Sequence, residues 1–406
     1  MNGRLVTALA LATFFVVVQF YTSLASLSAT PPVGYVFANR AVAVALIASL
    51  VSAVFIALVR LVRERIRPDA TSRALLLAWL GAASVSAVLG LDPLAGVQVV
   101  AIMALCALGH LGLVAYLRER RTRQVVLGAY LALGGLATLG ALAMVASHRP
   151  AELWTLNHGR AAGVFVTANQ FAAFLIAFIF VALGVAYGER GGWRVLGLGC
   201  ALVGCAALIA TVSQAGWLGA AAGAIFFAVA LGARRAALGF AVALVVAAAF
   251  FAIRPATRHN PAEAFDRVRI WTSGVRVATL FPLTGVGPMA YWRVYPAVRP
   301  PNADSPGTFG ALHPHDVYLS LAAETGVVGL VAFGFGWWRF ARAMRVRLRA
   351  SALPERALGI GACAALVAVF VQGFFDTVGV VELTFVWIPY AALALGSVAP
   401  AEAIRS

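Results

Sequence analysis

One stretch of the sequence, residues 254–329, holds most of the side chains that could do chemistry. Within it, His313 and His315 flank a proline in the motif HPHD, which ends at Asp316. The proline disfavours helix at His313, and Asp316 is a good N-cap for the apolar segment that follows. A neutral imidazole at such a helix start can accept a proton from a hydroxyl group. The helix dipole favours neutral His315 while the Asp316 charge favours imidazolium, so both a general base and a solvated loop histidine stay open.

Arginines supply a second kind of chemistry, because guanidinium groups bind phosphate oxygens in pairs. The segment DRVRIWTSGVRVATL, about residues 266–280, is predicted to form an amphipathic helix. Its polar face would carry Arg269, Thr272, Ser273 and Arg276, and its apolar face Ile270, Trp271, Val275 and Ala278. The helix is expected either to anchor the chain at the membrane interface through snorkelling arginines or to clamp a lipid-linked phosphate. For the clamp, Arg267 and Arg269 are favoured.

A membrane-buried acid is predicted shortly after HPHD. Glu324 lies eight residues into the apolar segment, about 12 Å along a helix at about 1.5 Å per residue. An ionisable group at that depth indicates pairing or function, and we expect Glu324 to orient a partner rather than react. Gly326 and Gly329 are expected to let a neighbouring helix come close. Other polar residues near the same face are more typical of helix-packing hydrogen bonds: Asn169, Gln170, Gln214, Asp376 and Glu382.

The elements that position these residues are predicted to be membrane helices. The chain has 406 residues, of which 62% are hydrophobic and 11% charged, with a mean hydropathy of +0.91. Soluble proteins average about 45–50% apolar and about 25% charged residues. The sequence therefore predicts an all-α polytopic membrane protein with about 12 transmembrane helices. The expected spans are 5–29, 41–62, 74–90, 94–117, 125–147, 163–187, 195–212, 217–233, 236–253, 316–338, 357–374 and 383–399.

Short arginine-rich loops predict the orientation, because such loops stay in the cytoplasm. The loops RERIRPDATSR, RERRTR, GERGGWR, GARR and RFARAMRVRLR all fall on one side of the expected spans. Both termini are then cytoplasmic. Residues 1–253 would form helices 1–9, residues 254–315 a long periplasmic loop with the interfacial helix, and residues 316–406 helices 10–12.

Charge and cysteine content exclude some classes of partner and site. All 31 basic residues are arginine, and the formal net charge is +16. This charge suits anionic membrane lipids, whereas no nucleic acid partner is expected, because most of the charge lies in short loops between spans. The four cysteines lie in apolar segments and form neither a disulfide framework nor a zinc spacing.

Four blocks of sequence resemble the O-antigen ligase family, and more widely the group that includes O-antigen polymerases and bacterial O-oligosaccharyltransferases. In family order they are GRAAGVFVTANQFA (159–172), RVRIW…FPLTGVG (267–287), HDVYLSLAAETGVVG (315–329) and FFD…E (374–382). The chain departs from the family at Asp316, where asparagine is usual, and at Gln214, where related proteins often carry arginine. Its length favours a ligase over the O-oligosaccharyltransferases.

The resemblance implies an inverting, metal-independent, GT-C-like glycosyltransferase of the bacterial inner membrane with its active site on the periplasmic side. No cofactor is implied. The donor would be O-antigen on undecaprenyl pyrophosphate, and the acceptor a sugar hydroxyl of the lipid A core, in lipopolysaccharide biosynthesis. His315, helped by His313, would take the proton. The remaining implied site residues are Arg267, Arg269, Arg160 and Arg276 for the pyrophosphate, and Glu324, Asn169, Gln214 and Asp316 for support.

Other functions stay open. Within the same group, the protein could be an O-antigen polymerase or an O-oligosaccharyltransferase. A transporter or flippase of lipid-linked sugars is the alternative from another class, and a non-catalytic sugar-lipid scaffold is a third. Transporters place ionisable and helix-breaking residues near the bilayer midplane, often in repeated halves. Here the polar groups gather toward one face and no repeat is visible, which favours transfer over transport.

Overall fold

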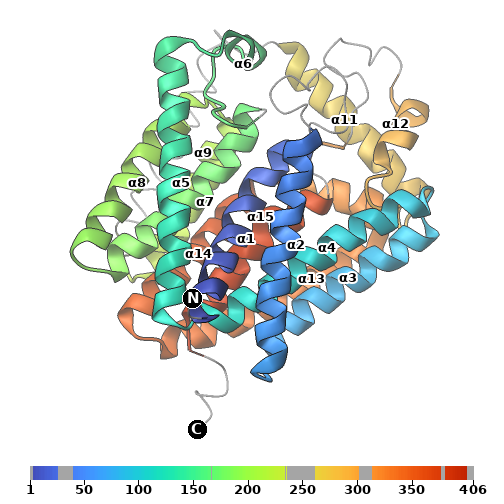
Figure 1. The fold of residues 1–406 in the computed structure, drawn as a ribbon. Helices are drawn as coiled ribbons and strands as arrows, with labels where there is room; N and C mark the ends of the chain where they lie inside the picture. Colours follow the sequence, from blue (N-terminus) through green and yellow to red (C-terminus); the bar gives the residue numbers. More distant parts are fainter. Residues whose placement is uncertain are drawn as a thin grey trace.

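The computed structural model describes residues 3–25, 40–165, 167–233, 235, 261–300, 313–375 and 380–399. The regular secondary structure of these residues is entirely helical, without strands (Figure 1). Eight of the described helices are long and apolar enough to cross a membrane. This confirms the prediction of an all-α, multi-pass membrane protein.

The described helices follow the expected spans closely. They are α1 (Gly3–Ala25), α2 (Arg40–Arg63), α3 (Ala70–Leu89), α4 (Pro93–Tyr116), α5 (Arg120–Ser147), α7 (Ala168–Gly188), α8 (Gly192–Ala210), α9 (Gln214–Ala230), α13 (Val317–Ala350), α14 (Leu353–Gln372) and α15 (Val380–Ser397). The expected span 236–253 lies outside the described residues. Helix α13 continues through the basic segment 339–349, which was expected to be a loop. That segment contains no glycine or proline to stop it, and arginine is a good helix former.

Helices α7 and α14 lie at the centre of the bundle, and small residues let them pack closely. A Cβ atom added at Gly361 would lie 2.5 Å from the backbone oxygen of Phe180, and one at Gly184 would lie 3.0 Å from that of Ala357. Such small residues let two helix backbones approach in a membrane. The close contact packs the first half of α14 against the last part of α7.

Three further helices gather at one end of the bundle: α6 (Ala151–Leu156), α11 (Pro261–Leu280) and α12 (Tyr291–Val298). Figure 1 shows them at the top, whereas α1 begins at the opposite end. The predicted amphipathic helix is part of α11. This end of the bundle is therefore covered by α6, α11 and α12, and the functional candidates lie there.

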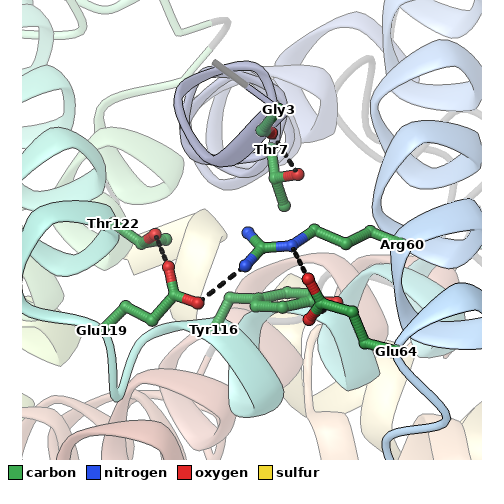
Figure 2. A network of polar contacts seen from close by, with 7 residues as sticks. All are labelled: Gly3, Thr7, Arg60, Glu64, Tyr116, Glu119 and Thr122. Atoms are coloured by element: carbon green, nitrogen blue, oxygen red, sulfur yellow. Dashed lines mark hydrogen bonds and ion pairs between the residues drawn. The ribbon is translucent and has the colours of Figure 1, made fainter.

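At the opposite end, ion pairs connect the helices to one another. Arg60 donates from Nε to Glu64 at 2.7 Å and from Nη2 to Glu119 at 2.8 Å, with its guanidinium 4.1 Å above the ring of Tyr116 (Figure 2). These contacts join α2 to the turn between α4 and α5. The guanidinium above the Tyr116 ring adds a cation–π contact to the two ion pairs.

A second ion pair at that end is almost fully buried. Arg347 donates from Nη2 to Asp69 at 2.6 Å, and the exposed fractions of the two side chains are 2% and 10%. Burial by itself raises the pKa of Asp69, but the Arg347 guanidinium and two backbone N–H groups outweigh it, so the net pKa is lowered. Asp69 also caps α3 through the N–H groups of Thr71 and Ser72. The pair thereby joins the start of α3 to the last turns of α13.

Candidate functional site

Helix α13 is broken one third of the way along, at Gly326 (φ +62°, ψ −162°). In an unbroken helix the N–H of Val327 would pair with Ala323 and that of Val328 with Glu324. The break separates a half-helix, Val317–Thr325, from the long remainder of α13. Four backbone groups consequently need other partners, because unpaired groups are costly inside a membrane protein.

The segment FPLTGVG, residues 281–287, supplies these partners, and we call it the 281–287 loop. Four backbone hydrogen bonds join it to the break: Val327 N to Pro282 O (2.9 Å), Val328 N to Leu283 O (3.2 Å), Val286 N to Ala323 O (2.9 Å) and Gly287 N to Glu324 O (3.0 Å). The hydroxyl of Ser86 on α3 adds contacts of 2.6 Å to the backbone oxygens of Thr284 and Glu324. The loop therefore replaces the two missing helical bonds and fixes the angle of the half-helix.

Glycines make this backbone contact possible. A Cβ atom at Gly285 (φ +68°) would lie 2.3 Å from the backbone carbon of Glu324, and one at Gly326 would lie 2.3 Å from the backbone oxygen of Leu283. Both positions also need a positive φ, which glycine adopts most easily. Gly326 was expected to let a neighbouring helix come close. The element that it admits is instead the 281–287 loop, so this expectation was wrong.

The half-helix begins immediately after the HPHD motif. Asp316 is its N-cap, as predicted, and its Oδ1 accepts from the N–H of Leu319 at 2.8 Å. Burial raises the pKa of the Asp316 carboxyl group, against the lowering effect of the N–H groups of Leu319 and Tyr318. His315 has a positive φ of +52°, and its ring centroid lies 4.5 Å from that of His313. The two imidazoles are therefore adjacent at the mouth of a helix.

Helix α11 packs against this motif. The indole nitrogen of Trp271 lies 3.4 Å from the backbone oxygen of His315. A Cβ atom at Gly274 would meet Leu319 at 2.6 Å and Pro314 at 3.1 Å, so this glycine lets the two elements touch. Ser273 is fully buried, although it was expected on the polar face; its hydroxyl is satisfied by the backbone oxygen of Arg269 at 3.0 Å. Contact with α13 thus decides the buried face of α11.

Arg160 lies in a polar network before α7. Its Nε donates to the backbone oxygen of Thr211 at 2.7 Å, and its Nη2 donates to Oδ1 of Asn169 at 2.8 Å. The backbone oxygen of Asn169 accepts from Nε2 of Gln372 at 3.0 Å. Arg160 is consequently connected through the first turn of α7 to the end of α14.

The separate blocks meet at residues 372–375, which comprise the last residue of α14 and the turn after it. Val317, the first residue of the half-helix, donates from its N–H to Gly373 at 2.8 Å. Arg267 of α11 donates to the backbone oxygen of Phe375. Together with the bond from Gln372, these contacts bring the histidine motif, Arg267 and Arg160 to one terminus. Four segments far apart in sequence thus form one constellation.

The other predicted site residues lie around this constellation or away from it. Arg276 donates to the backbone oxygen of Val298 at 2.9 Å, which directs its guanidinium to α12 rather than to HPHD. Gln214 is exposed at the start of α9, which Ser213 caps. Arg269 is half-buried on α11. Asp376 and the side chain of Glu382 lie outside the described residues.

Glu324 lies at the other end of the half-helix from His315. Its side chain is fully buried, and neither carboxyl oxygen has a hydrogen-bond partner within the part of the chain that is described. The backbone N–H groups of Met289 and Tyr291 face it, outside hydrogen-bond geometry. Glu324 therefore belongs to the contact with α12 and does not touch the histidines.

Sequence reasoning missed Gln372 and Ser86. Gln372 is a single amide at the end of an apolar helix, two residues before FFD, and that position was its only signal. Ser86 lies in an apolar helix far from every motif. Their roles depend on contacts with residues that are 203 and 238 positions away.

The constellation offers two chemical functions at one end of the bundle. The imidazoles can accept a proton from a hydroxyl group, and arginines near them can bind a phosphate-bearing group. Among the described residues, no group of three or more His, Cys, Asp or Glu side chains is placed to hold a metal ion.

A family model described as O-antigen ligase matches residues 198–334, which include α11, the 281–287 loop, HPHD and Glu324. The sequence resemblance to the O-antigen ligase family is thereby confirmed over residues 198–334. This family comprises membrane glycosyltransferase-like enzymes. The matched residues contain the break of α13, the loop that fills it and the histidine motif, whereas Arg160 and the end of α14 lie outside them.

One similar curated protein is the exopolysaccharide production protein ExoQ of Rhizobium meliloti (strain 1021). It is 28% identical to this chain over 191 residues, which cover 42% of this chain and 43% of ExoQ. The match therefore spans less than half the length of that relative.

Proposed function

We propose that this protein is an O-antigen ligase that moves O-antigen polysaccharide from undecaprenyl pyrophosphate to a sugar hydroxyl of the lipid A core. The observation that carries the proposal is the meeting of the HPHD motif, Arg267 and Arg160 at the end of α14. A base and a set of permanent cations at one place suit the transfer of a glycan from a pyrophosphate to a hydroxyl. The family match supports this choice of reaction.

In the proposed reaction His315 is the base. It takes the proton of the acceptor hydroxyl while the acceptor oxygen forms a bond to the anomeric carbon of the donor. The bond from that carbon to the pyrophosphate oxygen breaks, and undecaprenyl pyrophosphate leaves with the electron pair. Direct displacement inverts the anomeric configuration. General base catalysis of this kind contributes about 10²–10⁴-fold to a rate, and His313, whose ring contacts His315, supports the base.

The arginines stabilise the negative charge of the departing pyrophosphate. Arg267 and Arg160 are the primary candidates because both are tied to the end of α14, and Arg269 lies on the same helix as Arg267. Arg276, which faces α12, would act at the periphery. Fixed electrostatic groups are worth about 10²–10³-fold each in a rate. With this charge supplied by the protein, the proposed chemistry is metal-independent.

The proposed location is the bacterial inner membrane, in a GT-C-like bundle of about 12 helices that includes the expected span 236–253. The arginine-rich end, with Arg60 and Arg347, would face the cytoplasm by the positive-inside rule. The opposite end, with α6, α11 and α12, would then face the periplasm (Figure 1). This places HPHD and the arginines where O-antigen and lipid A core would meet.

O-antigen polymerase is the second candidate function. The relative ExoQ is named for exopolysaccharide production, so its name points to another glycan rather than to lipopolysaccharide. Polymerisation would use the same base and the same leaving group, and only the acceptor would differ. The constellation at the end of α14 serves either reaction.

A two-substrate assay separates these functions. The purified full chain is given a glycan on undecaprenyl pyrophosphate together with either lipid A core or a second donor molecule. The proposal expects a glycan–lipid A product with release of undecaprenyl pyrophosphate. Elongated lipid-linked glycan as the sole product would favour the polymerase, and movement of intact donor across vesicles without any product would favour transport.

A further inference from the structure

The carboxyl group of Glu324 is buried without a hydrogen bond from the described residues. The side chain is 0% exposed, and neither oxygen has a hydrogen-bond partner among the residues that the structure describes. The N–H groups of Met289 and Tyr291 face it without forming hydrogen bonds. An isolated carboxylate in such surroundings is strongly unfavourable and takes up a proton instead. A neutral carboxyl group therefore fits this site, whereas an ionised one does not.

Few titratable groups approach Glu324 from the packed elements. From α12, Tyr291 interacts with it, and Tyr295 lies against Tyr291 with ring centroids 5.8 Å apart. From α3, the Ser86 hydroxyl binds its backbone oxygen. From α11, the residues in the adjoining buried cluster are apolar, and Arg276 donates to α12 instead. Burial, with contributions from Tyr295 and Glu324, raises the pKa of Tyr291, so its phenol stays neutral near neutral pH.

The position of Glu324 couples its protonation to the half-helix. Its backbone oxygen accepts from Gly287 of the 281–287 loop, while its side chain meets the start of α12. The half-helix Val317–Thr325 runs from HPHD to this contact. Its first end is held by Gly373 and Trp271, and its last end by the loop. The same half-helix therefore connects the contact at Glu324 with the backbone of His315.

We propose that Glu324 is a positioning residue whose neutral carboxyl group lets the 281–287 loop and α12 close on the break of α13, which fixes the half-helix behind His315. Ionisation puts an uncompensated charge into this contact, and the loop and α12 then separate from the break. The effect on glycan transfer rests on the proposed function, whereas the closure is a property of the fold alone.

Amide hydrogen exchange on the full chain in lipid nanodiscs tests the closure. When the loop opens, Glu324 reaches water and ionises, so the opening equilibrium constant rises about tenfold per pH unit above the pKa of an exposed glutamate. The variant Glu324→Gln is neutral and nearly isosteric and lacks this dependence. At equal pH, the ratio of wild-type to variant exchange rates in residues 281–298 is expected to rise about tenfold for each pH unit, for as long as Glu324 stays neutral in the closed form.

A matched control is Glu355→Gln at the opposite end of the bundle, where Glu355 pairs with Arg123 at 3.3 Å. It is expected to leave exchange in residues 281–298 as in the wild type at every pH. If the wild type and Glu324→Gln show the same pH dependence in these residues, the carboxyl group does not control the closure and the proposal is overturned.

The pH profile of transfer provides the second readout. The wild type is expected to lose transfer at lower pH than Glu324→Gln on the alkaline side, because only the wild type can ionise at this position. If both proteins lose transfer over the same alkaline pH range, the closure does not position His315. A pH-dependent difference in exchange without any transfer by the wild type would contradict the proposed function while supporting the closure.

Discussion

Nη2 of Arg160 donates to Oδ1 of Asn169 at 2.8 Å, while the backbone oxygen of Asn169 accepts from Gln372 at 3.0 Å. One asparagine thus joins a guanidinium from before α7 to the end of α14. The same end receives Val317 and Arg267. The base and the cations of the proposed reaction are therefore connected to the same end of α14, although they lie far apart in the sequence.

Replacing Arg160 by lysine is predicted to impair donor use. Lysine keeps the charge but cannot reach the backbone oxygen of Thr211 and Asn169 together, as the guanidinium does. We expect kcat/KM for the donor to fall by about 10–100-fold, which corresponds to one charged hydrogen bond of about 1.5–3 kcal/mol. Arg149→Lys, at an exposed position, is the control. Equal donor kinetics for Arg160→Lys and the control would remove Arg160 from the site.

Arg267 and Arg276, both on α11, are predicted to contribute unequally to the rate of transfer. Arg267→Ala should reduce transfer at limiting donor by about 10²–10³-fold, because its guanidinium lies at the end of α14. Arg276→Ala should reduce it far less, since its guanidinium is held by Val298 on α12. Initial rates of both variants at the same donor concentrations check this. A larger loss for Arg276→Ala would mean that the phosphate lies over α12.

Gly285→Ala is predicted to destabilise the protein through a steric collision. A Cβ atom there meets the backbone of Glu324 at 2.3 Å, and φ is +68°. We expect a loss of about 2–5 kcal/mol, the sum of left-handed strain and overpacking. Gly232→Ala is the matched control, because φ is +81° at the end of α9 but no atom lies within 4 Å. It should cost about 1–2 kcal/mol from strain alone. Thermal unfolding in detergent compares the two, and equal losses would argue against the close contact.

Asp69→Asn is predicted to destabilise the protein at neutral pH by about 3–5 kcal/mol, because it leaves the buried Arg347 without its counter-charge. The pKa of Asp69 is lowered in the folded protein. The stabilisation is therefore present above the ordinary aspartate pKa of about 3.9 and is lost as the pH falls through the folded value. Thermal unfolding at pH 7 and near pH 3 should show the gap between wild type and variant shrinking in acid. A gap independent of pH would show that the carboxylate charge is not involved.

Local signals in the sequence were sufficient for most of the fold. Apolar length located the described membrane helices, and Pro314 with Asp316 located the start of α13. The break at Gly326 was not predicted, because its hydrogen-bond partners are some forty residues earlier and a glycine in an apolar helix usually indicates helix packing. The prediction that Ser273 lies on the polar face of α11 was wrong for a similar reason, since contact with α13 decides which face is buried.

For the site, the sequence identified the types of functional residue but not the residues that position them. The histidines and arginines were recognisable from motif and charge. Gln372, which ties Asn169 to the end of α14, has no signal of its own, because a single amide in an apolar helix gains its role only through a helix that begins 200 residues earlier. Such long-range contacts are what the three-dimensional structure adds.

The most direct test of the central claim is the transfer rate of His315→Asn. Asparagine tolerates the positive φ of +52° at this position, so the backbone of HPHD is preserved. His148→Asn is the matched control, because His148 also has a positive φ, +55°, and lies exposed outside the constellation. With glycan on undecaprenyl pyrophosphate and lipid A core, we predict a loss of at least about 10²-fold for His315→Asn and a rate within about twofold of wild type for the control. Transfer by His315→Asn at the wild-type rate would contradict the account.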